Sequence, residues 1–330
     1  MKISIVIPTY GSVENLPFLL ERIERVALSQ NLNYELILVD DNSPDNTLTY
    51  LKGVAVNQPQ IKVISFSRNF GQQVAISAGL KYTTGDAVII MDDDLQDPPE
   101  FIPDLINKWK EGYDIVYAIK VNRKEHFLKN FGYKMFYRVL SQLSEINIPQ
   151  DSGDFCIMSS QVVSILNSMN ERDRFLRGMR AWVGYKQIGI PCDRAKRLSG
   201  KPAYTFSKMI KLSLDGIFSF SNAPLRLISY SGFLVFFLAV IGTLVSLFQK
   251  IITALHLEGR ISEWSGFNPI VLSVLFIGGL QLIGIGIIGE YIGRIFNEVK
   301  QRPMFLIKET IGFDTINEPL DRNSNNNSVN

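Results

Sequence analysis

Short apolar runs alternate with segments of helical spacing over the first 120 residues. The runs expected to form strands cover residues 3–7, 35–39, 61–66, 87–91 and 114–118. The expected helices cover residues 16–26, 72–82 and 101–109, with a further helix that ends near Leu51 and is capped by Asp45 or Asn46. Strands that alternate with helices at this spacing form a mostly parallel, doubly wound sheet with helices on both faces. The pattern therefore predicts an α/β fold.

The pattern changes after residue 120. Residues 127–143 are expected to form a long helix whose aromatic side chains suit packing better than ligand binding. Residues 151–155 are expected to be irregular. Residues 194–213 carry six basic residues, several of them interleaved with apolar ones, as in a helix on an anionic membrane surface.

Two long uncharged segments follow. Residues 227–248 and 269–289 contain no charged side chain over 22 and 21 positions, which gives helices of about 33 Å and 31 Å, long enough to span a bilayer. Basic residues are concentrated on the outer flanks of this pair, so the positive-inside rule predicts that both termini are cytoplasmic. The polar tail at 323–330 is expected to be disordered.

These changes predict four parts of the chain. Residues 1–202 are expected to form a cytosolic catalytic domain, and residues 203–226 an amphipathic segment at the membrane interface. Residues 227–291 would hold two transmembrane helices joined by a short non-cytoplasmic loop. Residues 292–330 would form a cytoplasmic tail with a disordered end. A multi-pass arrangement in the membrane is therefore expected.

Composition excludes several classes of protein. The net charge of +2 gives no argument for nucleic-acid binding. Cys156 and Cys192 lack metal-ligand spacing and indicate reduced thiols in a cytosolic domain. With only His126 and His256 available, a histidine-based metal site or a Ser-His-Asp triad is not expected. The start of the chain has no signal-peptide pattern, and neither the dinucleotide fingerprint nor a Walker loop occurs.

The candidate chemistry lies where strands end. Asp92, Asp93 and Asp94 directly follow a buried strand, and three crowded carboxylates repel one another unless a cation is present. A divalent ion that carries a substrate's phosphates explains them better than an acidic, solvated loop does. Asp40 and Asp41 follow another strand, and Tyr10 a third, so all should meet at one edge of the sheet. The four arginines between residues 172 and 180 fit either a solvated helix face or phosphate contacts.

Seven stretches of this chain resemble glycosyltransferases of family 2 that load polyprenyl phosphates, above all bactoprenol-phosphate glucosyltransferases and, further off, dolichol-phosphate mannose synthases. They are residues 5–10, 39–43, 67–71, 92–100, 153–155, 174–178 and 289–294, and the run Asp-Asp-Asp-Leu-Gln-Asp-Pro-Pro-Glu at 92–100 is highly specific. The resemblance extends to about residue 303 and implies a location in the inner membrane of the cell. It implies the GT-A fold and inverting transfer of a sugar, glucose in the nearest relatives, from a UDP-linked donor to undecaprenyl phosphate.

The resemblance also assigns roles to individual residues. Asp154 is implied as the general base, although it could orient the acceptor instead, because a lipid phosphate is already an anion near neutral pH. Asp94 and Gln96 are implied to hold Mg²⁺ or Mn²⁺. The implied contacts to the nucleotide and donor are Pro8, Tyr10, Asp40, Asp41, Arg68, Asp92 and Asp93, and those to phosphate or acceptor are Arg174, Arg177, Arg197, Lys201 and Tyr204.

Three positions depart from the family pattern. Gly11-Ser12 replaces Asn-Glu, Cys156 replaces an arginine, and Ala203 replaces a lysine for which Lys201 could substitute. These departures leave the sugar open and keep a second hypothesis, a non-catalytic membrane partner of a lipid-sugar flippase. A processive polysaccharide synthase is disfavoured, because the Gln-x-x-Arg-Trp motif is absent. A homo-oligomer also remains open.

Overall fold

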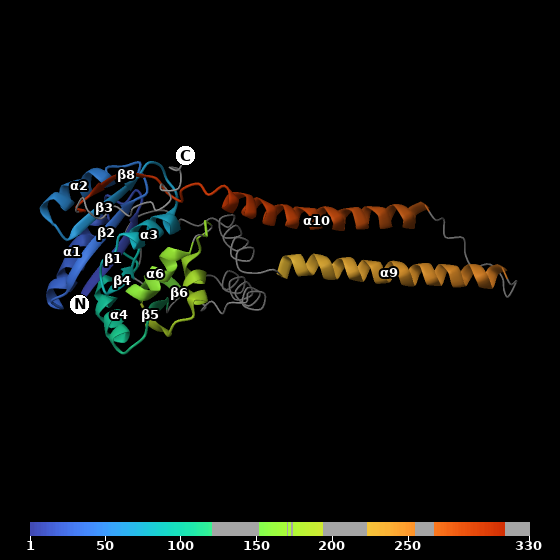
Figure 1. Cartoon of the computed structure of the whole chain (residues 1–330), viewed down its shortest axis with the longest axis horizontal. Helices are drawn as coiled ribbons and strands as arrows, with labels where there is room; N and C mark the ends of the chain where they lie inside the picture. The colour runs from blue at the N-terminus through green and yellow to red at the C-terminus, as the bar shows by residue number, and fades with distance from the viewer. Residues whose placement is uncertain (121–151, 170, 173, 194–222, 255–266, 314–330) are drawn as a thin grey trace, which may run out of the picture. The chain divides into compact units, whose positions relative to one another are not determined.

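The computed structural model describes residues 1–120, 152–169, 171–172, 174–193, 223–254 and 267–313 (Figure 1). The chain divides into two compact units. The first, here called the sheet domain, contains the described residues up to 193 together with 302–313. The second, here called the helical unit, contains the described residues 223–254 and 267–301.

An eight-stranded sheet forms the centre of the sheet domain, in the order β7-β5-β6-β4-β1-β2-β3-β8. The strands are β1 (Lys2–Thr9), β2 (Asn33–Asp40), β3 (Ile61–Phe66), β4 (Ala87–Ile90), β5 (Ile115–Lys120), β6 (Ser152–Ser159), β7 (Gln187–Cys192) and β8 (Ile307–Ile311). The pairs β1–β2, β1–β4, β2–β3 and β5–β7 are parallel, whereas β6 and β8 run antiparallel to their neighbours. The mostly parallel sheet expected from the sequence is therefore confirmed.

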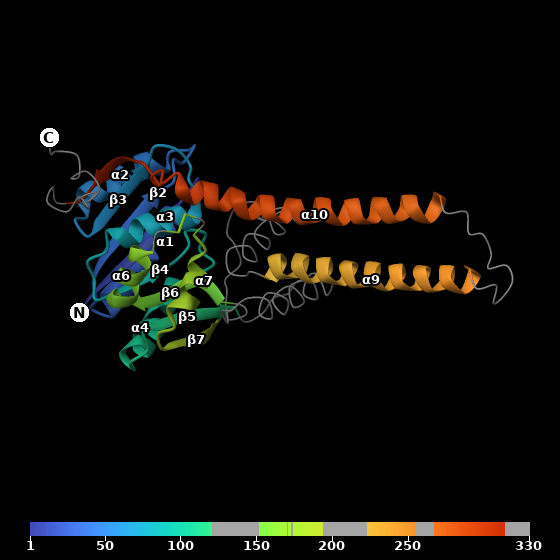
Figure 2. The same ribbon diagram turned by 45° about the vertical axis from the view of Figure 1, so that its right-hand side comes forward.

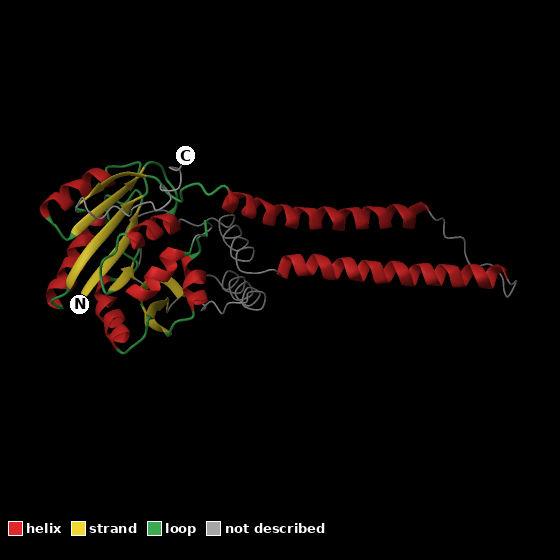
Figure 3. Ribbon diagram, in the orientation of Figure 1, coloured by secondary structure: helices red, strands yellow, loops and turns green. Residues whose placement is uncertain are grey.

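Helices cover both faces of this sheet (Figure 3). They are α1 (Leu16–Ser29), α2 (Thr47–Asn57), α3 (Gln72–Lys81), α4 (Ile102–Lys110), α6 (Ser160–Ser168) and α7 (Leu176–Val183), with a 3₁₀ turn at Pro99–Phe101. The expected helices and strands before residue 120 are confirmed to within three residues, except that α2 continues six residues beyond Leu51, to Asn57. Asn46 is the N-cap residue of α2, but its side chain makes no capping hydrogen bond; the side chain of Asp45, one residue earlier, accepts from the N–H of Thr47 at 3.1 Å.

Alternation along the strands decides which side chains meet which helices. Ile3, Ile5 and Ile7 of β1 belong to the core cluster shared with α1, α2 and α4. The residue between them, Val6, points to the opposite face, where a Cβ on Gly79 of α3 would come within 2.3 Å of its Cγ1. Glycine at 79 thus allows α3 to pack directly on the sheet.

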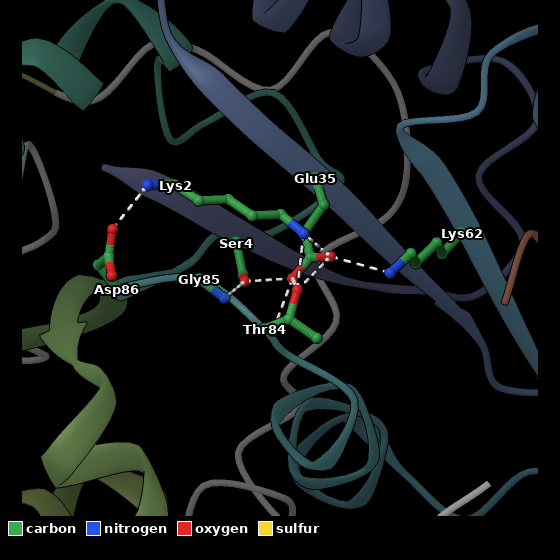
Figure 4. A network of polar contacts seen from close by, with 7 residues as sticks. All are labelled: Lys2, Ser4, Glu35, Lys62, Thr84, Gly85 and Asp86. Carbon is green, nitrogen blue, oxygen red and sulfur yellow. Dashed lines mark hydrogen bonds and ion pairs between the residues drawn. The ribbon is translucent and has the colours of Figure 1, made fainter. Parts of the chain in front are cut away.

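A polar network lies within the sheet domain at Glu35 of β2 (Figure 4). Its carboxylate is 2% exposed and accepts hydrogen bonds from Lys2, Lys62, Ser4 and Thr84. These donors hold the pKa of Glu35 at about 2 although burial acts to raise it. Because the donors come from β1, β3 and the turn before β4, the network ties the beginnings of the parallel strands together.

Two features of the sheet domain differ from the sequence pattern. The prediction of an irregular segment at 151–155 is wrong, because Ser152–Ser159 forms β6 and pairs with both β4 and β5. β8 was not predicted within the expected tail at 292–330, yet it pairs with β3 at the end of the sheet. The ring of Phe305 stacks on that of Phe66 at 5.3 Å, and the carbonyl of Leu306 accepts from the N–H of Ser67 at 3.0 Å.

The helical unit consists of α9 (Ala223–Ala254) and α10 (Phe267–Val299), which contact each other and lie side by side (Figure 2). Both contain segments long and apolar enough to cross a membrane, at Leu225–Gly242 and Phe276–Val299. Large apolar side chains such as Phe233, Leu234 and Phe276 are mostly exposed. The unit lies in the chain between β7 and β8, so the sheet domain is continued on both sides of it. The predicted helix at 127–143, the basic segment at 194–213 and the polar tail lie outside the described residues.

Candidate active site

The candidate residues gather where parallel strands end. β1, β2 and β4 lie side by side and run in the same direction, so the loops after Thr9, Asp40 and Ile90 meet at one edge of the sheet. Asp41 donates its backbone N–H to the carbonyl of Thr9 at 3.0 Å, and Met91 donates to Val6 at 3.2 Å. This edge is where open α/β sheets bind ligands.

β6 brings Asp154 to the same place. The register pairs Ile90 of β4 with Cys156 of β6 in an antiparallel ladder. Continued by two residues beyond the end of β4, this register sets Asp92 opposite Asp154. Phe155 and Ile157 point into the core cluster, so Asp154 points to the other face, where α3 and α7 lie. Two carboxylates that are 62 positions apart in the chain therefore become neighbours.

Asp92 is surrounded by other acids. Its pKa is raised well above the ordinary value, mainly by burial and then by the charges of Asp97, Asp154 and the two following aspartates. Its Oδ1 accepts a hydrogen bond of 2.7 Å from Nε2 of Gln72, in the first turn of α3. A cation at this position would relieve the repulsion among these groups.

Asp93 points to the loop after β1. Its Oδ2 accepts hydrogen bonds from the Ser12 hydroxyl and, at 3.4 Å, from the backbone N–H of Tyr10. Burial raises the pKa of Asp93 to about 6 in spite of these donors. Ser12, one of the residues that depart from the family pattern, thus connects the loop after β1 to the aspartate run.

Asp94 and Gln96 flank a residue with unusual backbone geometry. Leu95 has φ of 60° and a buried side chain, a conformation that is rare for leucine and common where structure is constrained for function. The N–H of Gln96 donates to Oδ1 of Asp94 at 3.1 Å. The buried Leu95 anchors this loop and leaves both neighbours half-buried.

The aspartate run fits a divalent ion that is bound together with its substrate. In the part of the chain that the structure describes, no group of three or more His, Cys, Asp or Glu side chains could hold a metal alone. Mg²⁺ usually takes only one or two protein carboxylates and completes its shell with waters and substrate phosphates. Asp92 and Asp94, whose charges lie close enough to interact, offer carboxylate oxygens of the kind that such binding uses.

Asp40 is the last residue of β2 and Asp41 is the first residue after it, and their carboxylates contact different partners. Asp40 accepts from the Ser65 hydroxyl at 3.1 Å and from the N–H of Ser43 at 3.2 Å. Asp41 accepts from the N–H groups of Phe70 and Gly71 at 2.6 and 2.8 Å, and burial raises its pKa. Both carboxylates are buried and organise the loops that surround the edge of the sheet.

The remaining candidates for the donor are less enclosed. Pro8 is buried in β1, whereas the Tyr10 side chain is 53% exposed. The Arg68 guanidinium lies over the Phe70 ring at 4.0 Å, in the loop that Asp41 holds. Tyr10, Arg68 and the aspartates thus belong to adjoining loops at this edge.

Asp154 is held by two side chains. Nε and Nη2 of Arg177 lie 2.8 and 3.1 Å from Oδ1 and Oδ2 of Asp154. Nε2 of Gln73 donates to Oδ2 at 3.4 Å, and Oε1 of Gln73 accepts from the N–H of Leu176 at 3.0 Å. Gln73 therefore connects α3, β6 and α7.

The other arginines have different surroundings. Arg174 is buried and donates to the carbonyls of Leu166 and Met169 at the end of α6. Arg180 is buried and lies over the Tyr117 ring at 5.0 Å. Burial raises the pKa of the Cys156 thiol, and the charge of Arg180 offsets only part of this rise. Of these arginines, Arg177 is the one that contacts Asp154. The sequence candidates Arg197, Lys201 and Tyr204 lie outside the described residues.

Gln72 and Gln73 are functional candidates that the sequence pattern did not single out. Each contacts one of the two facing carboxylates, Asp92 and Asp154 respectively. The available signal was two consecutive amides in the first turn of a helix that follows a glycine at a strand end. Helix periodicity alone does not distinguish such residues from solvent-exposed ones.

Comparison with known proteins identifies the family of this chain. The family described as Glycosyl transferase family 2 matches residues 4–165. An uncharacterized glycosyltransferase of Synechocystis is 41% identical over 323 residues, 98% of this chain and 99% of the relative. The bactoprenol glucosyl transferase of Shigella phage SfX is 39% identical over 309 residues, 93% of this chain and 99% of the relative. Among solved structures, S. aureus TarS with UDP-GlcNAc is 20% identical, with a TM-score of 0.45 over 67% of each chain. The full-length similarity shows that the chain belongs to glycosyltransferase family 2.

Proposed function

We propose that this protein transfers glucose from UDP-glucose to undecaprenyl phosphate, or a similar polyprenyl phosphate, at the cytoplasmic face of the inner membrane. The observation that carries this proposal is its similarity, over 93% of the chain, to a bactoprenol glucosyl transferase. That similarity includes the apolar helices as well as the sheet domain. The product would supply a cell-envelope glycan such as an O-antigen.

The reaction proposed is a single in-line displacement. A phosphate oxygen of the lipid attacks the anomeric carbon of the sugar and forms the new C–O bond. The bond from that carbon to the β-phosphate oxygen breaks, and the electron pair leaves with UDP. One displacement inverts the configuration at the anomeric carbon. The acceptor is anionic near neutral pH, since the second pKa of a phosphate monoester is about 6.

The residues of the sheet edge divide between donor and acceptor. The nucleotide would lie over Pro8 and Tyr10, beside the loops that Asp40 and Asp41 organise, with Arg68 near its phosphates. Asp92 and Asp93 would face the sugar and diphosphate. Asp154 and Arg177, on β6 and α7, would face the acceptor, with Arg174, Arg197, Lys201 and Tyr204 as further phosphate contacts expected from the family resemblance.

A divalent ion, Mg²⁺ or Mn²⁺, is proposed as the cofactor. Asp94 and Gln96 would hold it beside Asp92, and when bound it would stabilise the charge that develops on the departing diphosphate. The chain's own contribution is the loop around Leu95, whose left-handed backbone keeps the two ligands on either side of a buried anchor.

Membrane attachment is proposed for the helical unit. α9 and α10 contain apolar segments of 18 and 24 residues, and their exposed faces carry large apolar side chains. A pair of spans returns the chain to the side on which it began, which agrees with β8 belonging to the same sheet as β1. The basic flanks noted in the sequence favour the cytoplasm as that side.

The decisive experiment supplies membranes that contain this protein with a panel of labelled nucleotide sugars and undecaprenyl phosphate. Label from UDP-glucose is expected in the lipid extract, released by mild acid as glucose. If only another nucleotide sugar labels the lipid, that compound replaces UDP-glucose as the proposed donor. Absence of labelled lipid with every donor would favour the alternative, a non-catalytic partner of a lipid-sugar flippase.

A further inference from the structure

Both oxygens of the Asp154 carboxylate are already engaged. Arg177 contacts Oδ1 through Nε and Oδ2 through Nη2, and Gln73 contacts Oδ2 through its amide. The Asp154 side chain is 8% exposed, whereas that of Arg177 is 25% exposed. The carboxylate is thus the more enclosed partner, and the Arg177 side chain is the more exposed one.

This geometry suits orientation better than proton transfer. Paired N–H···O bonds between a guanidinium and a carboxylate fix both the distance and the plane of the guanidinium. Pairing with a guanidinium stabilises the charged form of a carboxylate and so makes it a weaker base. The proposed acceptor is already an anion, so no proton has to be removed from it.

Gln73 extends the same arrangement to the backbone. Its Oε1 accepts from the N–H of Leu176, the first residue of α7, and Arg177 is the next residue. The residue before the helix, Phe175, makes no side-chain cap, so Gln73 of α3 supplies an acceptor for the first turn of α7. One side chain therefore contacts both Asp154 and the backbone that carries Arg177.

Arg177 is a basic side chain that lies beside acidic ones. Asp92 follows β4, and Asp154 lies on the neighbouring strand β6, so both carboxylates lie at the edge of the sheet that an anionic acceptor would have to approach. A cation beside them would offset their repulsion of such an acceptor. Arg177 is the basic side chain that forms an ion pair with Asp154 in the described part of the chain.

Building on the proposed function, we propose that Arg177 binds the phosphate of the lipid acceptor and that Asp154 and Gln73 are positioning residues for its guanidinium. Asp154 then acts through Arg177 rather than as a general base. Loss of the Asp154 carboxylate should therefore weaken acceptor binding, whereas loss of a general base would slow only the chemical step.

The test measures kcat and both KM values in the full-length protein, with UDP-glucose and undecaprenyl phosphate in mixed micelles. Asp154→Asn, Gln73→Leu and Arg177→Lys should each raise the acceptor KM on the order of tenfold, the usual effect of losing a charge-assisted hydrogen bond. The donor KM should stay within about twofold, a change too small to indicate a lost contact. Asp154→Asn combined with Arg177→Lys should be no worse than the more severe single variant, because both remove the same contact.

Chemical rescue separates positioning from a general loss of structure. In Arg177→Ala, millimolar guanidinium ion should lower the acceptor KM, because Asp154 still offers its two oxygens. Guanidinium should have no such effect in the double variant Arg177→Ala with Asp154→Asn. A merely structural role for Asp154 would not make rescue depend on its carboxylate.

Matched variants define the background. Gln72→Leu, one residue from Gln73 and in contact with Asp92, should raise the donor KM and leave the acceptor KM unchanged. Arg25→Ala, in an exposed ion pair on α1, should change neither. If Asp154→Asn lowers kcat with an unchanged acceptor KM, Asp154 acts as a base and the inference is overturned. If the wild type itself forms no glucosyl lipid, the proposed function fails instead.

Discussion

The Oε2 atom of Glu35 lies 2.9 Å from Nζ of Lys62, and this ion pair joins β2 to β3 inside the sheet domain (Figure 4). The same oxygen lies 2.9 Å from Nζ of Lys2 on β1. One buried carboxylate thus connects three parallel strands at the end opposite to the candidate active site. Its protonation should affect stability without direct contact with substrate.

We expect the stability of the sheet domain to fall in acid because of Glu35. Its pKa is about 2 in the folded protein, against an ordinary value of 4.5. A depressed pKa stabilises the folded state above the unfolded-state value, and this contribution is lost as the pH falls from 4.5 towards 2. The difference corresponds to about 3 kcal/mol. Urea unfolding of the detergent-solubilised protein at pH 7, 5 and 3 measures it.

Glu35→Gln isolates this group. The variant should unfold at lower urea concentration at pH 7, because two ammonium groups lose their shared anion. It should also lose stability less steeply than the wild type between pH 5 and 3. Glu21→Gln, which breaks an exposed pair with Arg25, should follow the wild-type curve. If Glu35→Gln loses stability between pH 5 and 3 as steeply as the wild type, groups other than Glu35 cause the loss of stability in acid.

Asp94→Asn should abolish most transfer and leave the fold intact. Replacing the proposed metal ligand removes an interaction that stabilises the leaving diphosphate, so a loss on the order of 10²-fold or more is expected. Removing one of several crowded carboxylates should not destabilise the half-buried loop. EDTA should reproduce the loss in the wild type, and added Mn²⁺ or Mg²⁺ should reverse it.

The control for this prediction is Asp104→Asn, an exposed acid in the first turn of α4. It should retain full transfer and metal response. Undiminished transfer in Asp94→Asn, or in EDTA, contradicts the assignment of Asp94 and of the metal.

The positions of apolar runs predicted most of the fold, because buried parallel strands appear in the sequence as apolar runs. Residues 3–7, 35–39 and 87–91 became β1, β2 and β4 almost as expected. β6 was not predicted, because Asp151-Ser152-Gly153-Asp154 has the composition of a turn. Only pairing with β4 and β5 makes it a strand. β8 is short and half polar, so its position at the sheet edge depends on β3 and not on its own pattern.

The candidate site also contains some residues that local sequence predicts and others that it does not. Asp92, Asp93 and Asp94 follow a strand within one local stretch and were found from the sequence. That Asp154 lies opposite Asp92 follows from antiparallel register, which joins distant parts of the chain. Gln72 and Gln73 matter only because α3 begins beside both carboxylates. Such roles belong to tertiary contacts, which periodicity does not encode.

Phe305→Ala should weaken the sheet domain and its donor site together. The Phe305 ring stacks on Phe66, the last residue of β3, and the next loop carries Arg68. Loss of a half-buried aromatic ring should lower the free energy of unfolding by about 1–2 kcal/mol. The donor KM should rise because the loop after β3 loses support. Thermal unfolding and donor titration measure the two effects.

Leu306→Ala is the matched control for Phe305→Ala. Leu306 is exposed, and its contact with Ser67 is made by the backbone carbonyl, which alanine retains. Equal effects of the two variants would show that the Phe305–Phe66 stack is not what supports the loop.

The last prediction concerns a sheet domain without the helical unit. Because β8 follows α10 in the chain, a simple C-terminal truncation removes β8 and leaves β3 as an open edge. Replacing residues 223–301 by a Gly/Ser linker of about 20 residues, with a mean span of about 25 Å, keeps β8 in the same molecule. This bridged protein should be soluble and should bind UDP-glucose with metal. A chain that ends at residue 222 should be less stable and more prone to aggregate.

The bridged protein should distinguish between acceptors. A long-chain polyprenyl phosphate is confined to the headgroup plane of a bilayer, so an enzyme held at that surface meets it at a high effective concentration. Without α9 and α10, transfer to the long-chain acceptor in liposomes should fall much more than transfer to a short, water-soluble analogue. Equal transfer to the long-chain acceptor by the bridged and full-length proteins would mean that the helices do not contribute to the encounter. In that case the sheet domain alone would have to reach the headgroup plane.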